Sequence, residues 1–529
     1  MKDKKETLVI SLILLFALFL RIYNLENFPR WYVDEGTHAQ IGMNIMKGIW
    51  GYKTWGPNFF PPLFPVLTGL FIVLFGKSYF VIRTIGVLFG MLSILLTYLV
   101  GKKLYDKKVG VVAAIVLSVC GLFINRMAFM DNLVEFFFLL TIFSYIKSND
   151  SKKWLYVMGI SAGLTFLSKY TGIVAIIFIL SQSFLDKKLK NIKIPLMLFF
   201  CLSLVYPLLG MIFGWDAFVF DTLFQTKREL AYEFIHNFTL QPPYYFLHPN
   251  LETFYFWTLL GFISMIYLLL KRSSDKKRSH SDIVVFVAFL SFFLTSLIAK
   301  NVWWVYCIIF LPIYSLGIAV LVNDVFLEKR LLSILFLVFP IFLKLFFDQN
   351  MLYVLGISIM FLLLRSFYSR LLMKQEIKLK IILDRFLLSL VLFSFAYFFI
   401  EDISKINQNS VQDLREVVTY INENINKTEM VASNPNIMWL IDGIGVDYAQ
   451  MAFYTTKEYT YLYPIELYDR FKMNVTLDNF RYVVLDYPKW LEYYIGWSES
   501  AKSLTPRIQN EWKLVFQKGD VWMYENPRY

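Results

Sequence analysis

Residues 8–38 read LVISLILLFALFLRIYNLENFPRWYVDEGTH. The run from Leu8 to Tyr23 has the length and apolar character of a membrane-spanning helix, because a hydrocarbon core of about 30 Å requires such a run. A weakly basic segment, Met1 to Thr7, precedes it, and no small-residue cleavage site follows it. Such a site marks a cleaved signal peptide. We therefore expect an uncleaved first span that starts in the cytoplasm and leads directly into a charged loop.

The remainder of the chain repeats this pattern of apolar block and charged loop. Of the 529 residues, 57% are hydrophobic and 19% aromatic, and the mean hydropathy is +0.53. Apolar blocks of roughly 15–22 residues must be helical in lipid, because the backbone has to satisfy its own hydrogen bonds there. The composition therefore predicts an all-α polytopic membrane protein.

The net charge of +12 does not indicate nucleic-acid binding. Lysines and arginines lie in short loops between the apolar blocks, whereas nucleic acid requires a continuous basic face. By the positive-inside rule these loops face the cytoplasm together with the N-terminus. The basic loops are residues 102–108, 147–153, 186–193, 271–280, 328–330 and 365–380.

Two apolar runs separate the first outer loop from Lys102, but the alternation of loops allows only one of them to span. The run from Leu63 to Phe75 is short and follows Pro61-Pro62, so we expect it to form a re-entrant helix in the outer leaflet. About 13 spans result from this assignment. They cover residues 8–23, 79–100, 109–124, 132–146, 154–168, 170–185, 194–213, 251–270, 282–299, 303–323, 331–347, 351–365 and 381–400.

After Ile400 the chain becomes polar and aromatic, which predicts two domains. Residues 1–400 form the transmembrane domain, and residues 401–529 form a small α/β domain on the extracytoplasmic side. Ser410 is expected to cap a helix whose apolar face consists of Val411, Leu414, Val417, Val418 and Ile421. Strands are expected at 430–432, 482–485, 512–516 and 521–524, with Gly519-Asp520 as a hairpin turn between the last two.

Adjacent carboxylates directly after the first span are unusual. Asp34 could act as a general base and Glu35 as its helper or as a group that positions the acceptor. Alternatively, both could be first-turn acids of a juxtamembrane helix, stabilised by the helix dipole. The residues themselves leave both readings open.

Further charged or rigid positions lie at the predicted outer ends of the spans. Pro61 and Pro62 impose a defined turn that would shape a lipid-binding groove. Arg126 and Asp131 could bind phosphate and lie near a reaction centre, or simply pair with each other. Lys169 could neutralise a lipid phosphate, or extend to the headgroups.

The longest predicted outer loop, residues 214–250, contains Arg228 and Tyr245 as candidate substrate contacts. His236 and His248 lie in the same loop. A metal site needs three or more converging ligands, and no such spacing is present among these histidines or the three cysteines. We expect no cofactor. The alternative left open is a divalent metal ion, which a pyrophosphate-linked donor would favour.

These residues, in this order, resemble the motifs of the GT-C superfamily of multi-span glycosyltransferases that use lipid-linked sugars. The resemblance is greatest to protein O-mannosyltransferases and to the aminoarabinose transferases that modify lipid A, and it covers about residues 1–320. The matching positions are Asp34-Glu35, Pro61-Pro62-Leu63, Arg83, Arg126 with Asp131, Gly163-Leu164 with Leu167, Lys169 and Gly172, Pro243-Tyr244-Tyr245, and Lys300 with Tyr306 and Pro312.

The resemblance implies an inverting glycosyl transfer from a polyprenyl- or dolichyl-phosphate sugar on the extracytoplasmic face. Asp34 would be the general base, and Arg126, Asp131, Lys169 and Arg228 would surround the donor phosphate. One departure is that Phe59-Phe60 replaces the acidic and basic residues that often precede Pro-Pro in this superfamily. Membrane lipids are the expected surroundings, and the acceptor is undefined.

Two other functions are compatible with a many-helix membrane protein. A lipid or polysaccharide transporter or flippase would show internal repeats and broken helices near the membrane midplane. No repeat is evident, and the unusual charges gather at one leaflet. A non-catalytic membrane assembly protein with an outer adhesion module is the other alternative.

Overall fold

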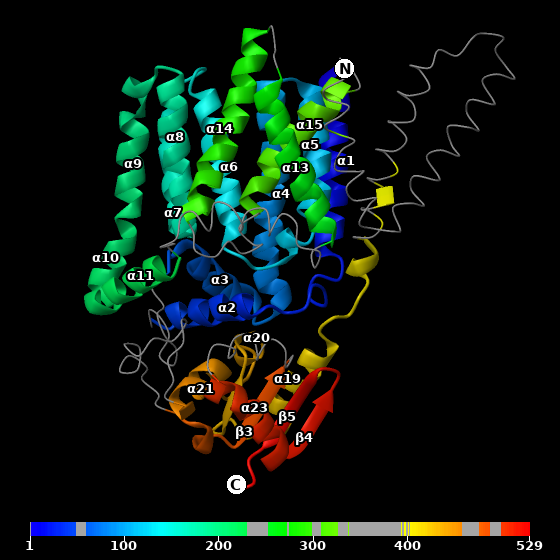
Figure 1. Cartoon of the computed structure of the whole chain (residues 1–529), viewed down its shortest axis with the longest axis vertical. Helices are drawn as coiled ribbons and strands as arrows, with labels where there is room; N and C mark the ends of the chain where they lie inside the picture. The colour runs from blue at the N-terminus through cyan, green and yellow to red at the C-terminus, as the bar shows by residue number, and fades with distance from the viewer. Residues whose placement is uncertain are drawn as a thin grey trace, which may run out of the picture.

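A computed structural model of the chain describes residues 2–48, 60–229, 252–271, 275–298, 308–325, 403–456, 475–486 and 499–529, together with 337, 393, 396–397 and 400. These residues form a helical bundle with a small α/β domain at one end (Figure 1). The N-terminus lies at the opposite end of the bundle. The predicted spans 331–347, 351–365 and 381–400 lie wholly or mostly outside the described residues.

The long helices of the bundle correspond to the apolar blocks. Three described segments are long and apolar enough to span a membrane, namely 79–104, 189–213 and 276–295. The total of about 13 spans stays a prediction. The bundle helices are α1 (Lys2–Ile22), α4 (Tyr79–Leu104), α5 (Lys107–Cys120), α6 (Asp131–Lys147), α7 (Lys153–Ser168), α8 (Val174–Leu185), α9 (Lys193–Ser203), α10 (Val205–Phe213), α13 (Glu252–Leu270), α14 (Lys276–Ile298) and α15 (Leu311–Asn323).

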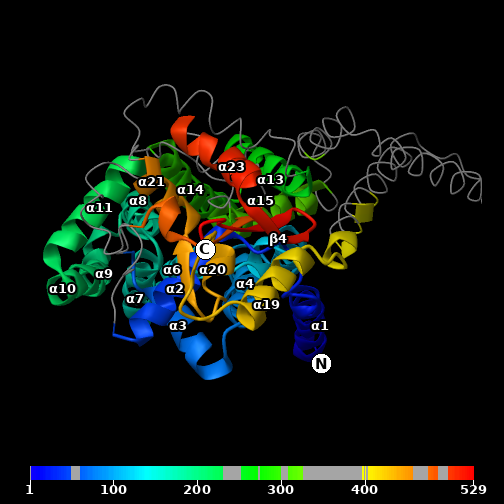
Figure 2. The same ribbon diagram turned by 90° about the horizontal axis from the view of Figure 1, so that it is seen from below.

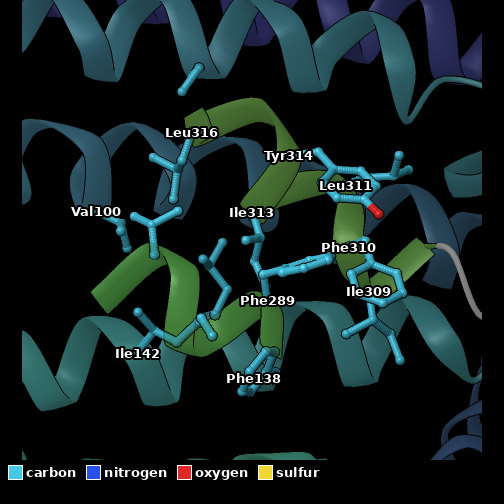
Figure 3. Packing of buried hydrophobic residues seen from close by; sticks show 14 of the residues in the cluster. Val100, Phe138, Ile142, Phe289, Ile309, Phe310, Leu311, Ile313, Tyr314 and Leu316 are labelled. Carbon is cyan, nitrogen blue, oxygen red and sulfur yellow. The ribbon is translucent and has the colours of Figure 1, made fainter. Parts of the chain in front are cut away.

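Helix α15 packs mainly against α5 and α13. All its residues from Leu311 to Leu321 are buried, as expected for a helix that is apolar on every side. Side chains from this region fill the space between the neighbouring helices (Figure 3). The ring of Phe310 stacks on Tyr314 at 5.3 Å and meets Phe292 edge-on at 4.6 Å. These contacts hold the bundle together away from its polar ends.

Ion pairs connect the first basic loops to the N-terminal end of the bundle. Lys107 Nζ lies 3.1 Å from Glu6 Oε2 in the first turns of α1. Lys103 Nζ lies 2.9 Å from Asp150 Oδ2 in the second basic loop. The N-terminus and these two loops therefore share one end, as the predicted alternation requires. That this end faces the cytoplasm remains a prediction.

Two short helices, α2 (Val33–Met46) and α3 (Leu63–Phe75), lie at the other end, between the bundle and the α/β domain (Figure 1). They cross in backbone contact, because a Cβ atom on Gly69 would lie 2.4 Å from the carbonyl oxygen of Gly42. Phe64 is fully buried, whereas Leu74 and Phe75 are exposed at 61% and 66%. The segment expected to be re-entrant is thus a short helix with one apolar face turned outward.

The C-terminal domain is built on a five-stranded sheet with the order β2-β1-β3-β5-β4. Strand β1 is parallel to both β2 and β3, and β5 is antiparallel to β3 and β4. The hairpin between β4 and β5 is as predicted, with Gly519 at a positive φ of 53°. The strands are β1 (Met430–Ser433), β2 (Ile444–Asp447), β3 (Tyr482–Asp486), β4 (Lys513–Lys518) and β5 (Val521–Glu525).

The sequence-based reading of this domain was wrong in two places. It missed β2, and it assigned Ser410 as a helix cap. Helix α19 (Gln412–Asn424) begins after Val411, and the Ser410 hydroxyl instead donates to the carbonyl of Asn27 at 2.9 Å. The buried face of α19 is as expected. The other helices of the domain are α20 (Pro435–Met438), α21 (Tyr448–Thr456) and α23 (Glu499–Glu511).

The C-terminal domain packs directly on α2 and on the start of α4 (Figure 2). Trp31 and Tyr79 stack with ring centroids 4.4 Å apart, and the Tyr79 hydroxyl donates to the carbonyl of Asn436 at 2.9 Å. Gly36 lies against α20, where a Cβ atom would be 2.1 Å from the carbonyl oxygen of Pro435. Only a residue without a side chain permits this approach.

Polar side chains of the membrane domain add to this interface. Arg30 pairs with both oxygens of Asp413 at 2.9 Å and with Asp486 at 3.3 Å. Among the described residues, four side chains, including that of Arg30, donate to main-chain carbonyls of the C-terminal segment. The hydrogen bonds are those of Asn24 with the carbonyls of Ile406 and Gln408, Arg30 with that of Ser410, Lys77 with that of Ile441, and Tyr79 with that of Asn436.

Gly36→Ala should weaken this docking. The new methyl group would overlap the Pro435 carbonyl, and overpacking of this kind costs about 1–3 kcal/mol. Thermal unfolding in detergent and the rate of proteolytic release of the C-terminal domain measure the effect. Gln40→Ala, a half-buried position of the same helix, serves as the control. A Gly36→Ala protein as stable as wild type would contradict the close approach.

Candidate functional site

The first turn of α2 is anchored by a buried ion pair between Glu35 and Arg83. Both side chains are 0% exposed, and the Arg83 Nη2 to Glu35 Oε2 distance is 2.8 Å. Arg83 Nε donates to Glu35 Oε1 at 2.9 Å, so the pair is bidentate. The remaining Arg83 donors bind the carbonyls of Leu25, Pro29 and Arg30. Arg83 thus connects α4 to the loop that carries the acidic pair.

Every oxygen of Glu35 is used within the protein. Oε1 also accepts from the backbone N–H of Ala128 at 2.8 Å, and Oε2 accepts from that of Tyr32 at 3.1 Å. A carboxylate that is buried and saturated in this way has no lone pair directed at a substrate. The catalytic role expected for Glu35 is therefore corrected to a structural one, in which it positions the first turn of α2.

Asp34 lies one residue earlier and is exposed. It follows the N-cap residue Tyr32 by two positions and lies in the first turn of α2. Consecutive residues of a helix point in different directions. The anchoring of Glu35 therefore fixes the orientation of the backbone from which Asp34 projects.

Arg126 has a role different from the predicted one. It is 0% exposed, and its guanidinium donates to the carbonyls of Leu20, Tyr23 and Phe28 at 2.5–2.8 Å. Leu20 is in the last turn of α1, where carbonyls lack partners within the helix. Arg126 thus caps α1 and has no exposed surface to offer a donor phosphate, which argues against its predicted role at the phosphate site.

Asp131 pairs with Lys169 rather than with Arg126. Lys169 Nζ lies 2.9 Å from both Asp131 oxygens. Asp131 begins α6, and Lys169 directly follows the last residue of α7. The exposed fraction of the side chain is 3% for Asp131 and 15% for Lys169. The lysine is therefore the partner that reaches the surface, and Asp131 fixes its position.

His38 lies within electrostatic reach of Lys169, and it was missed from the sequence. It is 6% exposed, and its pKa is lowered to about 3, chiefly by burial and also by the positive charge of Lys169. His38 comes one helical turn after Asp34, so the two share a face of α2. Glu35 binds the N–H of Ala128 just before α6, Lys169 binds Asp131 at the start of α6, and α2 packs on α20. The first turns of α2, the start of α6 and Lys169 are therefore at the same end of the bundle as the C-terminal domain.

The remaining predicted residues have different outcomes. Pro61 and Pro62 are buried and precede α3 directly, between two phenylalanines whose rings meet His38 edge-on. Arg228 lies in helix α11 (Trp215–Glu229), whose C-terminal side chains are not described, and Tyr245 lies outside the described residues. Among the residues that are described, no group of three or more potential metal ligands occurs.

Comparison with known proteins agrees with this architecture. Residues 60–210 match the family model of dolichyl-phosphate-mannose-protein mannosyltransferase. No curated protein sequence matches the chain.

Solved structures extend the comparison to the whole chain. ArnT from Cupriavidus metallidurans in the apo state has a TM-score of 0.63 at 12% identity, covering 97% of both chains. The structure of the same ArnT bound to undecaprenyl phosphate has a TM-score of 0.63 at 13% sequence identity, again covering 97% of both chains. The archaeal oligosaccharyltransferase AglB from Archaeoglobus fulgidus has a TM-score of 0.55 at 15% sequence identity, and the match covers 100% of this chain and 75% of that one. The chain thus has a GT-C fold, and the resemblance to O-mannosyltransferases and aminoarabinose transferases is confirmed.

The Glu35–Arg83 pair makes a testable prediction about stability. Arg83→Met leaves Glu35 as an uncompensated buried charge, so the free energy of unfolding should fall by about 3–5 kcal/mol. Arg83→Met combined with Glu35→Gln removes both charges and should recover part of that loss. Thermal unfolding of the purified variants in detergent measures both effects. A double variant less stable than Arg83→Met alone would be evidence against the pairing.

Proposed function

We propose that the chain is a membrane glycosyltransferase that moves a sugar from a polyprenyl- or dolichyl-monophosphate donor to an acceptor hydroxyl. The main support is one arrangement, an exposed Asp34 next to the buried Glu35–Arg83 pair. Glu35 binds the N–H of Ala128, three residues before Asp131, which in turn binds Lys169. The GT-C fold adds to it, since ArnT of this fold has been solved with undecaprenyl phosphate and AglB with a dolichol-phosphate.

In the proposed reaction, Asp34 accepts the proton of the acceptor hydroxyl. The hydroxyl oxygen attacks the anomeric carbon from the face opposite the phosphate, and a new C–O bond forms. The bond between the anomeric carbon and the phosphate oxygen breaks, and the phosphate leaves with the bonding electrons. The configuration at the anomeric carbon is therefore inverted. An exposed carboxylate is suited to the base role, because its oxygens can reach the proton of an acceptor hydroxyl.

Lys169 is the proposed cation for the leaving phosphate. Negative charge develops there during the transfer, and a cation fixed in advance stabilises it without reorganisation. Asp131 supplies that fixation by binding Nζ through both oxygens. Since phosphate is already a good leaving group, this chemistry needs neither an acid catalyst nor a metal ion.

The proposed site is on the extracytoplasmic side. The basic loops 102–108 and 147–153 gather with the N-terminus at the far end of the bundle, and basic loops favour the cytoplasm. Asp34, Lys169 and the C-terminal domain would then face outward. The apolar, outward-turned face of α3 would line the path of the polyprenyl tail.

Asp34→Asn should abolish transfer while leaving the fold intact. Loss of a general base lowers the rate by about 10²–10⁴-fold, and the exposed position of Asp34 makes the change mild for stability. Transfer and hydrolysis of radiolabelled mannose, glucose and N-acetylglucosamine carried on dolichyl or undecaprenyl monophosphate measure the rate. Asp216→Asn, at the exposed start of α11, is the matched control. Wild-type turnover by Asp34→Asn would refute the base assignment.

Removal of the lysine should weaken phosphate binding. Because Lys169→Met alone would leave Asp131 buried and unpaired, the informative protein combines Lys169→Met with Asp131→Asn. A hydrogen bond to a charged group is worth about 1.5–3 kcal/mol, so affinity for undecaprenyl phosphate should fall about tenfold to a hundredfold. Lys47→Met, at the exposed end of α2, is the control. Unchanged affinity in the double variant would exclude Lys169 as a phosphate ligand.

A further inference from the structure

His38 is a buried side chain with a hydrogen-bonding atom that the protein does not use. The residue is 6% exposed, and its Nδ1 atom is buried without a hydrogen-bond partner. The rings of Phe60 and Phe64 meet the imidazole edge-on, with centroids 6.0 and 5.3 Å away. The imidazole is therefore held in place by aromatic packing on α2 and on the start of α3.

An unpartnered buried nitrogen is costly for the fold. A buried polar atom without a partner loses about 1–3 kcal/mol relative to one that is satisfied, and most such atoms in proteins have a partner. A phenylalanine would fit the same aromatic surroundings without this cost. The polar atom is therefore better explained by a ligand than by packing.

The position of His38 indicates which ligand this is. It lies on the same face of α2 as Asp34, one turn further along. It also lies close enough to Lys169 for that charge to act on the imidazole. In the proposed reaction, the atom attacked near Asp34 and the phosphate near Lys169 belong to the same sugar phosphate. The sugar ring would therefore lie beside His38.

We infer, on the basis of the proposed function, that His38 Nδ1 forms a hydrogen bond with a hydroxyl group of the donor sugar. The imidazole is neutral at physiological pH, because burial and Lys169 lower its pKa to about 3. A neutral imidazole offers one donor and one acceptor nitrogen, which suits a hydroxyl group. A phosphate, which only accepts, is better served by the ammonium of Lys169. His38 thus contributes to recognition of the sugar.

The test is His38→Phe, which keeps a planar ring and removes the nitrogen. Because the lost atom has no partner in the protein, we expect thermal stability equal to or above that of wild type. The kcat/KM for the sugar donor that wild type uses best should fall about tenfold or more, as expected for a lost hydrogen bond to substrate. Affinity for undecaprenyl phosphate, which carries no sugar, should be unchanged. His38→Gln restores a polar group and should recover part of the activity.

The same substitution at the far end of the bundle, His280→Phe, is the control. His38→Phe with wild-type kcat/KM would overturn the inference, as would an equal loss of affinity for the sugar-free lipid, which would place the contact at the phosphate. A wild-type protein that neither transfers nor hydrolyses any sugar of the panel would instead overturn the proposed function itself, and this inference with it.

Discussion

The buried pair of Arg83 and Glu35 is the interaction on which the polar end of the molecule depends. Arg83 projects from a long apolar helix and binds three carbonyls of the loop after α1. Glu35 in turn binds the backbone directly before α6 through the N–H of Ala128. Two charges at this depth are tolerated because each is matched and fully hydrogen-bonded. They bring three distant segments of the chain together, and the candidate site is formed where these segments meet.

The charged side chains at the site have two different roles. The buried side chains, which bind backbone groups, are Glu35, Arg83 and Arg126. Asp34 is exposed, and Lys169 reaches the surface while it pairs with the buried Asp131. The buried side chains fix the backbone, and they therefore restrict the movement of the side chains that can contact a substrate. Such preorganisation is what electrostatic catalysis requires, since the charges need not move during the reaction.

Much of this organisation is predictable from the sequence, because it follows from length and apolar pattern. The short run Leu63–Phe75 and the hairpin at Gly519 are examples, since each depends on a local property of the chain. The partners of Glu35 and Arg126 were not predictable from the sequence, because burial and partners depend on residues far away in the chain. Strand β2 was missed because it has only four residues, one of them glycine. His38 left only one signal, its spacing of four residues from Asp34.

The manner in which the two domains meet has an evolutionary consequence. Asn24, Arg30, Lys77 and Tyr79 all donate to carbonyl oxygens of the C-terminal segment, and every amino acid supplies a carbonyl. Substitutions in that segment can therefore accumulate without loss of these carbonyl contacts, provided that the path of the main chain is unchanged, whereas the pairs of Arg30 with Asp413 and Asp486 require those two carboxylates. Insertions and deletions near residues 406–441 would be tolerated far less well. Outside these two carboxylates, the C-terminal domain can thus change its side chains at this interface while its attachment persists.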